Sequence, residues 1–130
     1  MIAYRMQDAS RNINDLLDPE QQYSFPMSGD DEDIRRGVSG CESLAELAAY
    51  LTTHCIEATT PVLVRIEGPA SDDEPLDAEV GEVLVMPTAA ELIEDDEEFF
   101  NLVGDLVDAY WESGCTLEHG ELVEMAEARI

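Results

Sequence analysis

Charge imbalance is the most informative feature of this sequence, because it bears on solubility, partners and association. Its 130 residues include 31 Asp and Glu, six Arg and no Lys, and the formal net charge is −25. A small domain needs a net charge of only about 2–8 for solubility, and a larger excess destabilises the compact state by self-repulsion. The excess therefore requires an explanation, which is a very salty solvent, a strongly basic partner or a set of acidic tails.

Acidic tails do not account for the charge. Tails are blocks of like charge without apolar residues, and only residues 30–33 and 94–98 approach that composition. The second run leads directly into two phenylalanines, and the other acids are spread along the chain. Because 45% of the residues are hydrophobic and recur periodically, we expect residues 1–130 to form a single folded domain.

Runs of β-branched residues and proline punctuation predict the strands. Alternation over Ile2–Met6 predicts one strand, and the runs over residues 61–67 and 82–86 predict two more. Residues 24–40 and 69–79 are rich in Pro, Gly, Ser and acids, so we expect them to be loops.

Capping signals and helical periodicity predict the helices. Ser43 and Glu46 form a capping box at the start of a helix that should end near Ala58. A longer helix ends at Gly114, and Thr116 can cap a last helix.

One stretch, residues 88–93, fits either the start of the long helix or a further strand. In the second case the helix begins at the acidic run from Glu94. Either choice predicts an α+β fold, with a small β-sheet and two or three helices packed on it.

Acids form a regular stripe on the predicted long helix, opposite its apolar face. The stripe runs from Glu94 to Glu112, about 27 Å at 1.5 Å per residue. Duplex DNA carries one charge per roughly 1.7 Å, and loop acids would bring the stripe toward that density. Any amphipathic helix has a polar face, but here almost no cations are interleaved with the acids. The residues expected to contact a partner are Glu94, Asp95, Glu98, Asp105, Asp108 and Glu112 on the helix, with Asp30, Asp31, Asp33, Asp72 and Asp73 in the loops.

This surface resembles that of acidic DNA-mimic inhibitors, which phages and mobile elements make against restriction enzymes, CRISPR effectors or DNA-repair enzymes. The resemblance lies in size, charge and the placement of acids on folded elements. It implies an inhibitor that occupies the basic, nucleic-acid-binding groove of a partner protein and has no catalytic activity. The main alternative is an ordinary protein of a halophile or GC-rich organism, in which the acids keep the surface hydrated.

Three short segments elsewhere resemble the Arg, Ser and Glu motifs of ADP-ribosyltransferases. They contain Arg5 on the first predicted strand, Ser39 and Glu82. In that family the Arg and Ser help to hold a dinucleotide, and the Glu stabilises the developing oxocarbenium ion. The resemblance implies a degenerate ADP-ribosyltransferase-like enzyme. The chain lacks the family's Ser-Thr-Ser run, and Val80 stands where Glu or Gln is usual. Without catalysis, Arg5 would pair with a surface acid and Glu82 would simply begin a strand.

Several other classes of function do not fit the residues. Six Arg among 31 acids cannot form a basic patch, so we expect no direct binding of nucleic acid or an anionic membrane. Cys41, Cys55 and Cys115 lack metal-site spacing, and phosphate-binding loops are missing, so we expect no metal or cofactor. The odd number of cysteines and the lack of a leader or long apolar run predict a cytoplasmic protein.

Overall fold

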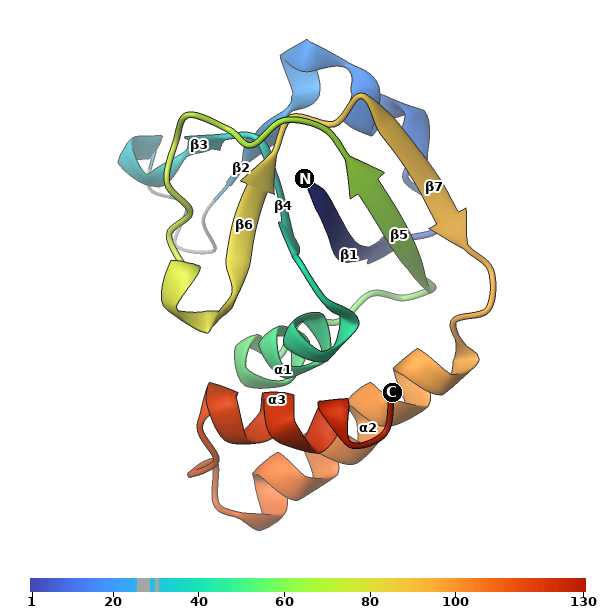
Figure 1. Cartoon of the computed structure of the whole chain (residues 1–130), viewed down its shortest axis with the longest axis vertical. Coiled ribbons are helices and arrows are strands. Elements are labelled where there is room, and N and C mark those ends of the chain that lie inside the picture. Colours follow the sequence, from blue (N-terminus) through green and yellow to red (C-terminus); the bar gives the residue numbers. More distant parts are fainter. Residues whose placement is uncertain (26–28, 30) are drawn as a thin grey trace.

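The computed structural model describes residues 1–25, 29 and 31–130. Its main sheet is antiparallel with strand order β6-β4-β1-β5-β7 (Figure 1). The central strand β1 pairs with β5 at seven positions but with β4 at only one, where Tyr4 lies opposite Cys41. The strands are β1 (Ile2–Asp8), β4 (Val38–Cys41), β5 (Pro61–Glu67), β6 (Glu82–Val85) and β7 (Ala89–Ile93).

A small second sheet and four 3-10 turns lie among the connections. The second sheet pairs β2 (Tyr23–Ser24) with β3 (Arg35–Arg36). Its connection contains a turn of three acids, η3 (Asp31–Asp33). The remaining turns are η1 (Ile13–Leu17), η2 (Pro19–Gln21) and η4 (Ala78–Val80).

The three helices of the described residues lie on one face of the main sheet. They are α1 (Leu44–His54), α2 (Glu97–Glu112) and α3 (His119–Glu127). In Figure 1, α1 lies next to the sheet, and α2 and α3 lie beyond it. Both outer helices pack on α1. No helix among the described residues is long and apolar enough to cross a membrane.

Hydrophobic cores lie on both faces of the sheet. The larger one joins sheet residues such as Leu63 to Leu106 and Leu122 of the outer helices. The smaller one lies on the other face, where Leu16 of η1 covers Val64 and Ile66. Burial on both faces explains why β5 reads as a nearly continuous apolar run. The predicted α+β fold class is confirmed.

The prediction of a loop over residues 24–40 was wrong at its end. Arg35–Arg36 forms β3, and Val38–Cys41 forms β4 between β1 and β6. Its Gly and Ser were taken as loop signals, but Gly40 has a packing role. A Cβ at this position would lie 2.8 Å from the Tyr4 carbonyl oxygen, so glycine allows β4 to approach β1 closely.

The strand alternative for residues 89–93 is confirmed, since they pair with β5 as strand β7 and α2 begins at Glu97, within the acidic run 94–98. The boundaries of the other helices differ from the prediction. The last helix is capped by Glu118 and Glu121, and not by Thr116. Helix α1 ends at His54, before the expected Ala58, because Cys55 adopts a left-handed conformation.

Candidate functional sites: a polar cleft and an acidic helix face

Arg5, Ser39 and Glu82 come together on three adjacent strands. The Arg5 guanidinium donates from Nη1 to the Ser39 carbonyl oxygen at 3.1 Å. The Ser39 hydroxyl donates to Glu82 Oε2 at 2.6 Å. One chain of hydrogen bonds therefore crosses from β1 through β4 to β6. The expectation that Arg5 pairs with a surface acid was wrong, since Arg5 is half-buried and donates to a carbonyl oxygen.

The position of Arg5 follows from the sparse pairing between β1 and β4. Beyond the Tyr4–Cys41 pair no ladder continues, so the Ser39 carbonyl accepts from the Arg5 side chain. The Arg5 Nε atom is buried without a hydrogen-bond partner. Removal from water, with a smaller effect of the Arg11 charge, lowers the pKa of Arg5 to about 10. Arg5 is thus a cation with a donor still available.

Glu82 connects this chain to a second polar group on α1. Its Oε1 accepts from the Asp77 backbone N–H at 3.0 Å, so both carboxylate oxygens are engaged. Asp77 Oδ2 accepts from the Tyr50 hydroxyl at 3.1 Å and lies 3.5 Å from His54 Nε2. The Tyr50 and His54 rings are stacked with centroids 4.0 Å apart. Spacing of four residues on α1 explains this stack.

Two cavities open beside these groups, and both reach Tyr50. One of about 390 Å³ is lined by Arg35, His54 and Glu82, among others. The other, of about 210 Å³, is lined by Arg5 and Ser39. We call this region, with Arg5, Ser39, Tyr50, His54, Asp77 and Glu82, the polar cleft.

Burial and the carboxylates around the polar cleft raise the pKa of Tyr50 and Cys41, so both groups stay protonated. Burial, followed by the charges of Glu82 and Asp77, raises the pKa of the Tyr50 hydroxyl. Burial, with the charges of Glu46 and Glu82, raises the pKa of the Cys41 thiol to about 12. At neutral pH Tyr50 is therefore a hydrogen-bond donor, and Cys41 is a buried thiol without nucleophilic character.

The acidic stripe on α2 is shorter than expected. Glu98, Asp105, Asp108 and Glu112 lie on α2 and are exposed. They span about 21 Å at 1.5 Å per residue. Glu94 and Asp95 are exposed but precede the helix, so they do not extend the stripe. We call the four α2 carboxylates the acidic helix face.

Cations are scarce beside the acidic helix face. Residues 94–130 contain twelve Asp and Glu and a single Arg. That residue, Arg129, pairs with Asp105 at 2.5 Å. Within the described part of the chain, Glu98, Asp108 and Glu112 have no cationic nitrogen within 4.0 Å.

The loop acids do not continue this stripe. Asp31 and Asp33 lie on η3, and Asp73 accepts from the Arg36 backbone N–H at 2.7 Å. Figure 1 shows this region at the left of the sheet, well away from α2. Asp72 is exposed in the same loop as Asp73, and Asp30 lies outside the described residues. The loop acids thus lie apart from the acidic helix face in this view, and contact of either set with a partner stays a prediction.

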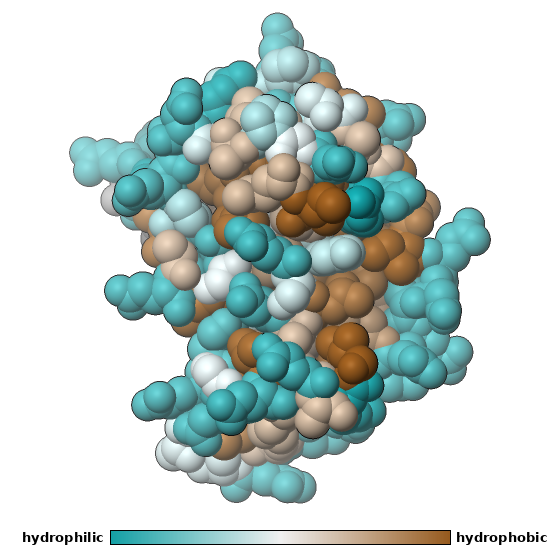
Figure 2. Space-filling model, viewed as in Figure 1, coloured by the Kyte–Doolittle hydropathy of each residue, from teal (hydrophilic) through white to brown (hydrophobic). Residues whose placement is uncertain are grey.

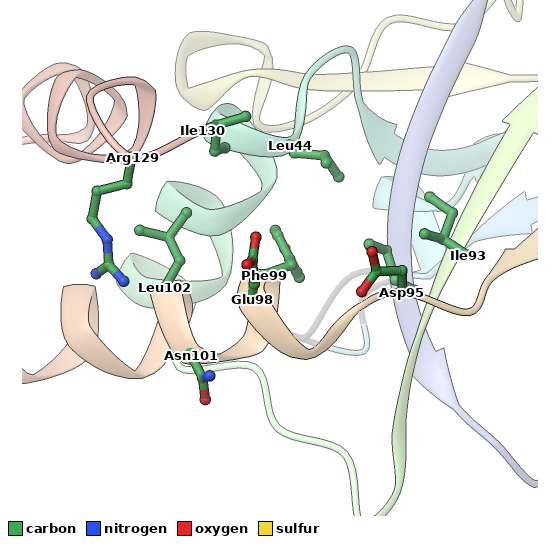
Figure 3. A pocket seen from close by; sticks show the side chains of 10 residues that line it. Leu44, Ile93, Asp95, Glu98, Phe99, Asn101, Leu102, Arg129 and Ile130 are labelled. Atoms are coloured by element: carbon green, nitrogen blue, oxygen red, sulfur yellow. The ribbon is translucent and has the colours of Figure 1, made fainter.

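A third hollow lies beside the N-terminus of α2 (Figure 3). It has a volume of about 480 Å³ and an apolar floor that includes Leu63, Phe99 and Leu102. Asp95 and Glu98 stand at its edge. Among the described residues, no three His, Cys, Asp or Glu side chains are placed to hold a metal ion.

Sequence reasoning missed three members of the polar cleft. The Tyr50–His54 stack could have been predicted, because the two aromatic rings are four residues apart on a predicted helix. Asp77 carried no such signal, because its position depends on the turn η4 and on the bond to Glu82.

Comparisons with known protein families, curated proteins and solved structures find no match to this chain. The assignment of function therefore depends on the geometry of the two candidate sites.

Proposed function

We propose that the polar cleft binds NAD and that the chain is an ADP-ribosyltransferase-like enzyme. One observation carries this proposal. Arg5, Ser39 and Glu82 resemble that family's motifs, are separated by 34 and 43 positions in the sequence, and are joined by hydrogen bonds on adjacent strands. The strand order β6-β4-β1 brings these three positions together.

The residues around the polar cleft suit a dinucleotide. Arg5 and Arg35, two of only six cations, line its cavities, and guanidinium groups bind phosphate oxygens well. The stacked rings of Tyr50 and His54 provide a flat surface for an aromatic base or nicotinamide. These two cations, one in each cavity, oppose the repulsion that the overall charge exerts on a phosphate.

Glu82 has the role of stabilising charge in this proposal. The bond between ribose C1′ and the nicotinamide nitrogen breaks, and its electron pair leaves with the ring, which becomes neutral. Positive charge develops on the ribose, where a held carboxylate stabilises it. An acceptor nucleophile then bonds to C1′ and loses its proton. Ser39 holds Glu82 in one orientation, since its hydroxyl donates to Oε2.

The experiment measures NAD binding by calorimetry and nicotinamide release by chromatography. Glu82→Gln should lower turnover at least about 100-fold, because it removes the charge while keeping the hydrogen-bonding shape. Glu79→Gln is the matched control, since Glu79 is an exposed acid in the neighbouring turn η4. A wild-type chain that neither binds nor consumes NAD would contradict the proposal.

The acidic helix face supports a second candidate function, that of occupying a basic groove on a nucleic-acid-binding protein. Glu98, Asp108 and Glu112 are exposed and have no ion pair with any other described residue, and a rigid helix holds them at fixed spacing. Complementary charge would speed association and make it sensitive to salt. Exposed Trp111 on the same helix offers an aromatic anchor.

A competition assay tests this second function. The protein is added to DNA cleavage by a restriction endonuclease and by a guide-RNA-directed nuclease at low salt. Reversing Glu98, Asp108 and Glu112 to Lys should abolish inhibition. Reversing the exposed acids Asp72, Glu124 and Glu127 changes the net charge equally and should have less effect. Equal loss in both variants would show that only global charge matters, and no inhibition by the wild type would reject the function.

A further inference from the structure

We infer that the hollow beside the N-terminus of α2 receives a Lys or Arg side chain of a basic partner protein. This inference rests on the second candidate function and adds to it a specific point of attachment. The aliphatic stem of the incoming side chain would lie against the apolar walls, and its charged end would lie between Asp95 and Glu98.

The walls of the hollow offer accessible apolar surface to an aliphatic stem. Leu44 and Ile93 are half-buried there, and Ile130 is 67% exposed. The floor beneath them, which includes Leu63, Phe99 and Leu102, is nearly fully buried. Lys and Arg side chains bury their methylene stems on such surfaces while keeping the charge hydrated.

The edge of the hollow selects for a cation. Figure 3 shows Glu98 pointing from α2 into the space bounded by Leu44, Leu102 and Ile130, with the Asp95 carboxylate beside Ile93. Both acids are exposed. Within the described residues, neither has a cationic nitrogen within 4.0 Å. Asn101 points away from this space.

The chain's own Arg129 shows how a cation lies against this part of α2. Arg129 lines the same hollow, and its guanidinium donates to Asp105 two turns beyond Glu98. Arg129 therefore neutralises the far end of the hollow and leaves Asp95 and Glu98 for an incoming charge. An anionic ligand would meet Asp95 and Glu98, which have no cationic nitrogen within 4.0 Å among the described residues, so charge complementarity favours a cation.

The hollow is larger than one side chain requires. Its volume of about 480 Å³ lies within the range of sites that hold small ligands. A neighbouring hollow shares Leu44 and Ile130 and has Glu42 and Glu127 at its margin. Figure 2 shows hydrophobic surface right of centre with hydrophilic side chains on both sides of it. The occupant is thus a protein segment in which an apolar residue adjoins the Lys or Arg.

The test uses small probes and nuclear magnetic resonance of the full chain. The probes are n-hexylammonium, n-hexanol and n-hexanoate, which share a stem and differ in charge. Hexylammonium should shift the resonances of Leu44, Ile93 and Phe99 at millimolar concentration, hexanol more weakly, and hexanoate not at all. Equal shifts with all three probes, or none with hexylammonium, would overturn the inference.

Neutral variants locate the charge. Asp95→Asn with Glu98→Gln should weaken hexylammonium binding about fivefold and leave hexanol binding unchanged. Asp108→Asn with Glu112→Gln is the matched control, since both acids are exposed on α2 outside the hollow. An equal loss in the two variants would assign the effect to the general field of the helix and reject the specific position.

The cleavage assay distinguishes this inference from the function on which it rests. If the wild type inhibits neither nuclease, the second function fails, whatever the probes do. If the wild type inhibits and the Asp95→Asn, Glu98→Gln variant inhibits equally, the function stands and the partner's side chain does not enter the hollow. A loss of inhibition in that variant with full inhibition by the control supports both.

Discussion

The polar cleft and the acidic helix face both carry carboxylates, but the two regions treat them in opposite ways. In the cleft, Glu82 accepts from Ser39 and from a backbone N–H, and Asp77 accepts from Tyr50. On α2, Asp105 has an ion pair, while Glu98, Asp108 and Glu112 have none among the described residues. Charges that are held by hydrogen bonds have fixed positions, whereas charges that project from a helix act mainly through their summed field.

This difference suits the two regions to different functions. A held carboxylate suits chemistry, because its orientation is set before a substrate arrives. A field of unpaired carboxylates suits attraction of a cation over distance, and salt weakens it. The helical layer also gains little from electrostatics, so its stability must depend on apolar contacts with α1.

Loss of apolar packing should have the largest effect. Leu122 on α3 is fully buried against the helical layer, and Leu122→Ala should lower the free energy of unfolding by about 2–5 kcal/mol. Denaturation by urea measures the change. Leu92→Ala is the control, since Leu92 is 48% exposed on β7, and it should cost about 0.5 kcal/mol or less. A small effect at Leu122 would mean that charge, and not packing, holds α3.

Alkaline pH should destabilise the folded state through the buried thiol of Cys41. The pKa of Cys41 rises from 9.0 to about 12 on folding, so the folded state keeps a proton that the unfolded state loses. Stability is therefore complete below pH 9 and falls as the pH rises toward 12, by about 2 kcal/mol at pH 10.5. Urea titrations at pH 8 and 10.5 measure this loss.

Cys41→Ala should remove most of that pH dependence, because two smaller contributions then oppose each other: the raised pKa of Tyr50 lowers stability as the pH rises, and the lowered pKa of Arg5 raises it. Cys115→Ala should leave it unchanged because Cys115 is exposed. If both variants retain the full dependence, groups other than Cys41 carry it.

Removal of one donor from the polar cleft should have a moderate effect. Ser39→Ala leaves Glu82 Oε2 without its hydroxyl donor and should cost about 1 kcal/mol, because the site is half-buried. Ser10→Ala is matched in chemistry, since the Ser10 hydroxyl also donates to a carboxylate, that of Asp8, but in an exposed position. Thermal unfolding should show a smaller change for Ser10. Equal changes would mean that the cleft is no better ordered than the surface.

Salt should have the smallest effect on the folded state. Dilution of NaCl from 0.5 to 0.05 M increases the Debye length, so repulsion between the acids reaches further. It should lower the free energy of unfolding by about 1 kcal/mol or less. Neutralising Asp108 and Glu112 should reduce this dependence more than Glu82→Gln does. We expect cooperative folding at 0.1 M salt. Unfolding there would favour the alternative that the acids serve hydration in concentrated salt.

Local signals predicted those elements whose limits depend on adjacent residues. Strand β5 follows from the β-branched run after Pro61, and the start of α1 follows from Ser43, whose hydroxyl accepts from the Glu46 N–H. Strand β4 was missed because its two neighbours, and not its own residues, stabilise it: Gly40 is tolerated where β1 approaches closely. Long-range pairing of this kind has no local signature.

The candidate sites divide along the same line. Exposure of Glu98 and Asp108 was predictable from helical periodicity. The hydrogen-bonded chain from Arg5 to Glu82 was implied only by a resemblance in motif order. Strand order brings these residues together, and strand order cannot be read from adjacent residues.

Because β1 is the central strand, its pairing is delayed during synthesis of the chain. Strand β1 pairs along its full length only with β5, whose last residue, Glu67, follows Asp8 by roughly 60 positions. At a synthesis rate of about 5–20 residues per second, β1 waits some 3–12 s on the ribosome for its partner. During that interval its backbone is open to pairing with other chains. Residues 1–67 hold more Asp and Glu than Arg, and this net negative charge opposes pairing between nascent copies.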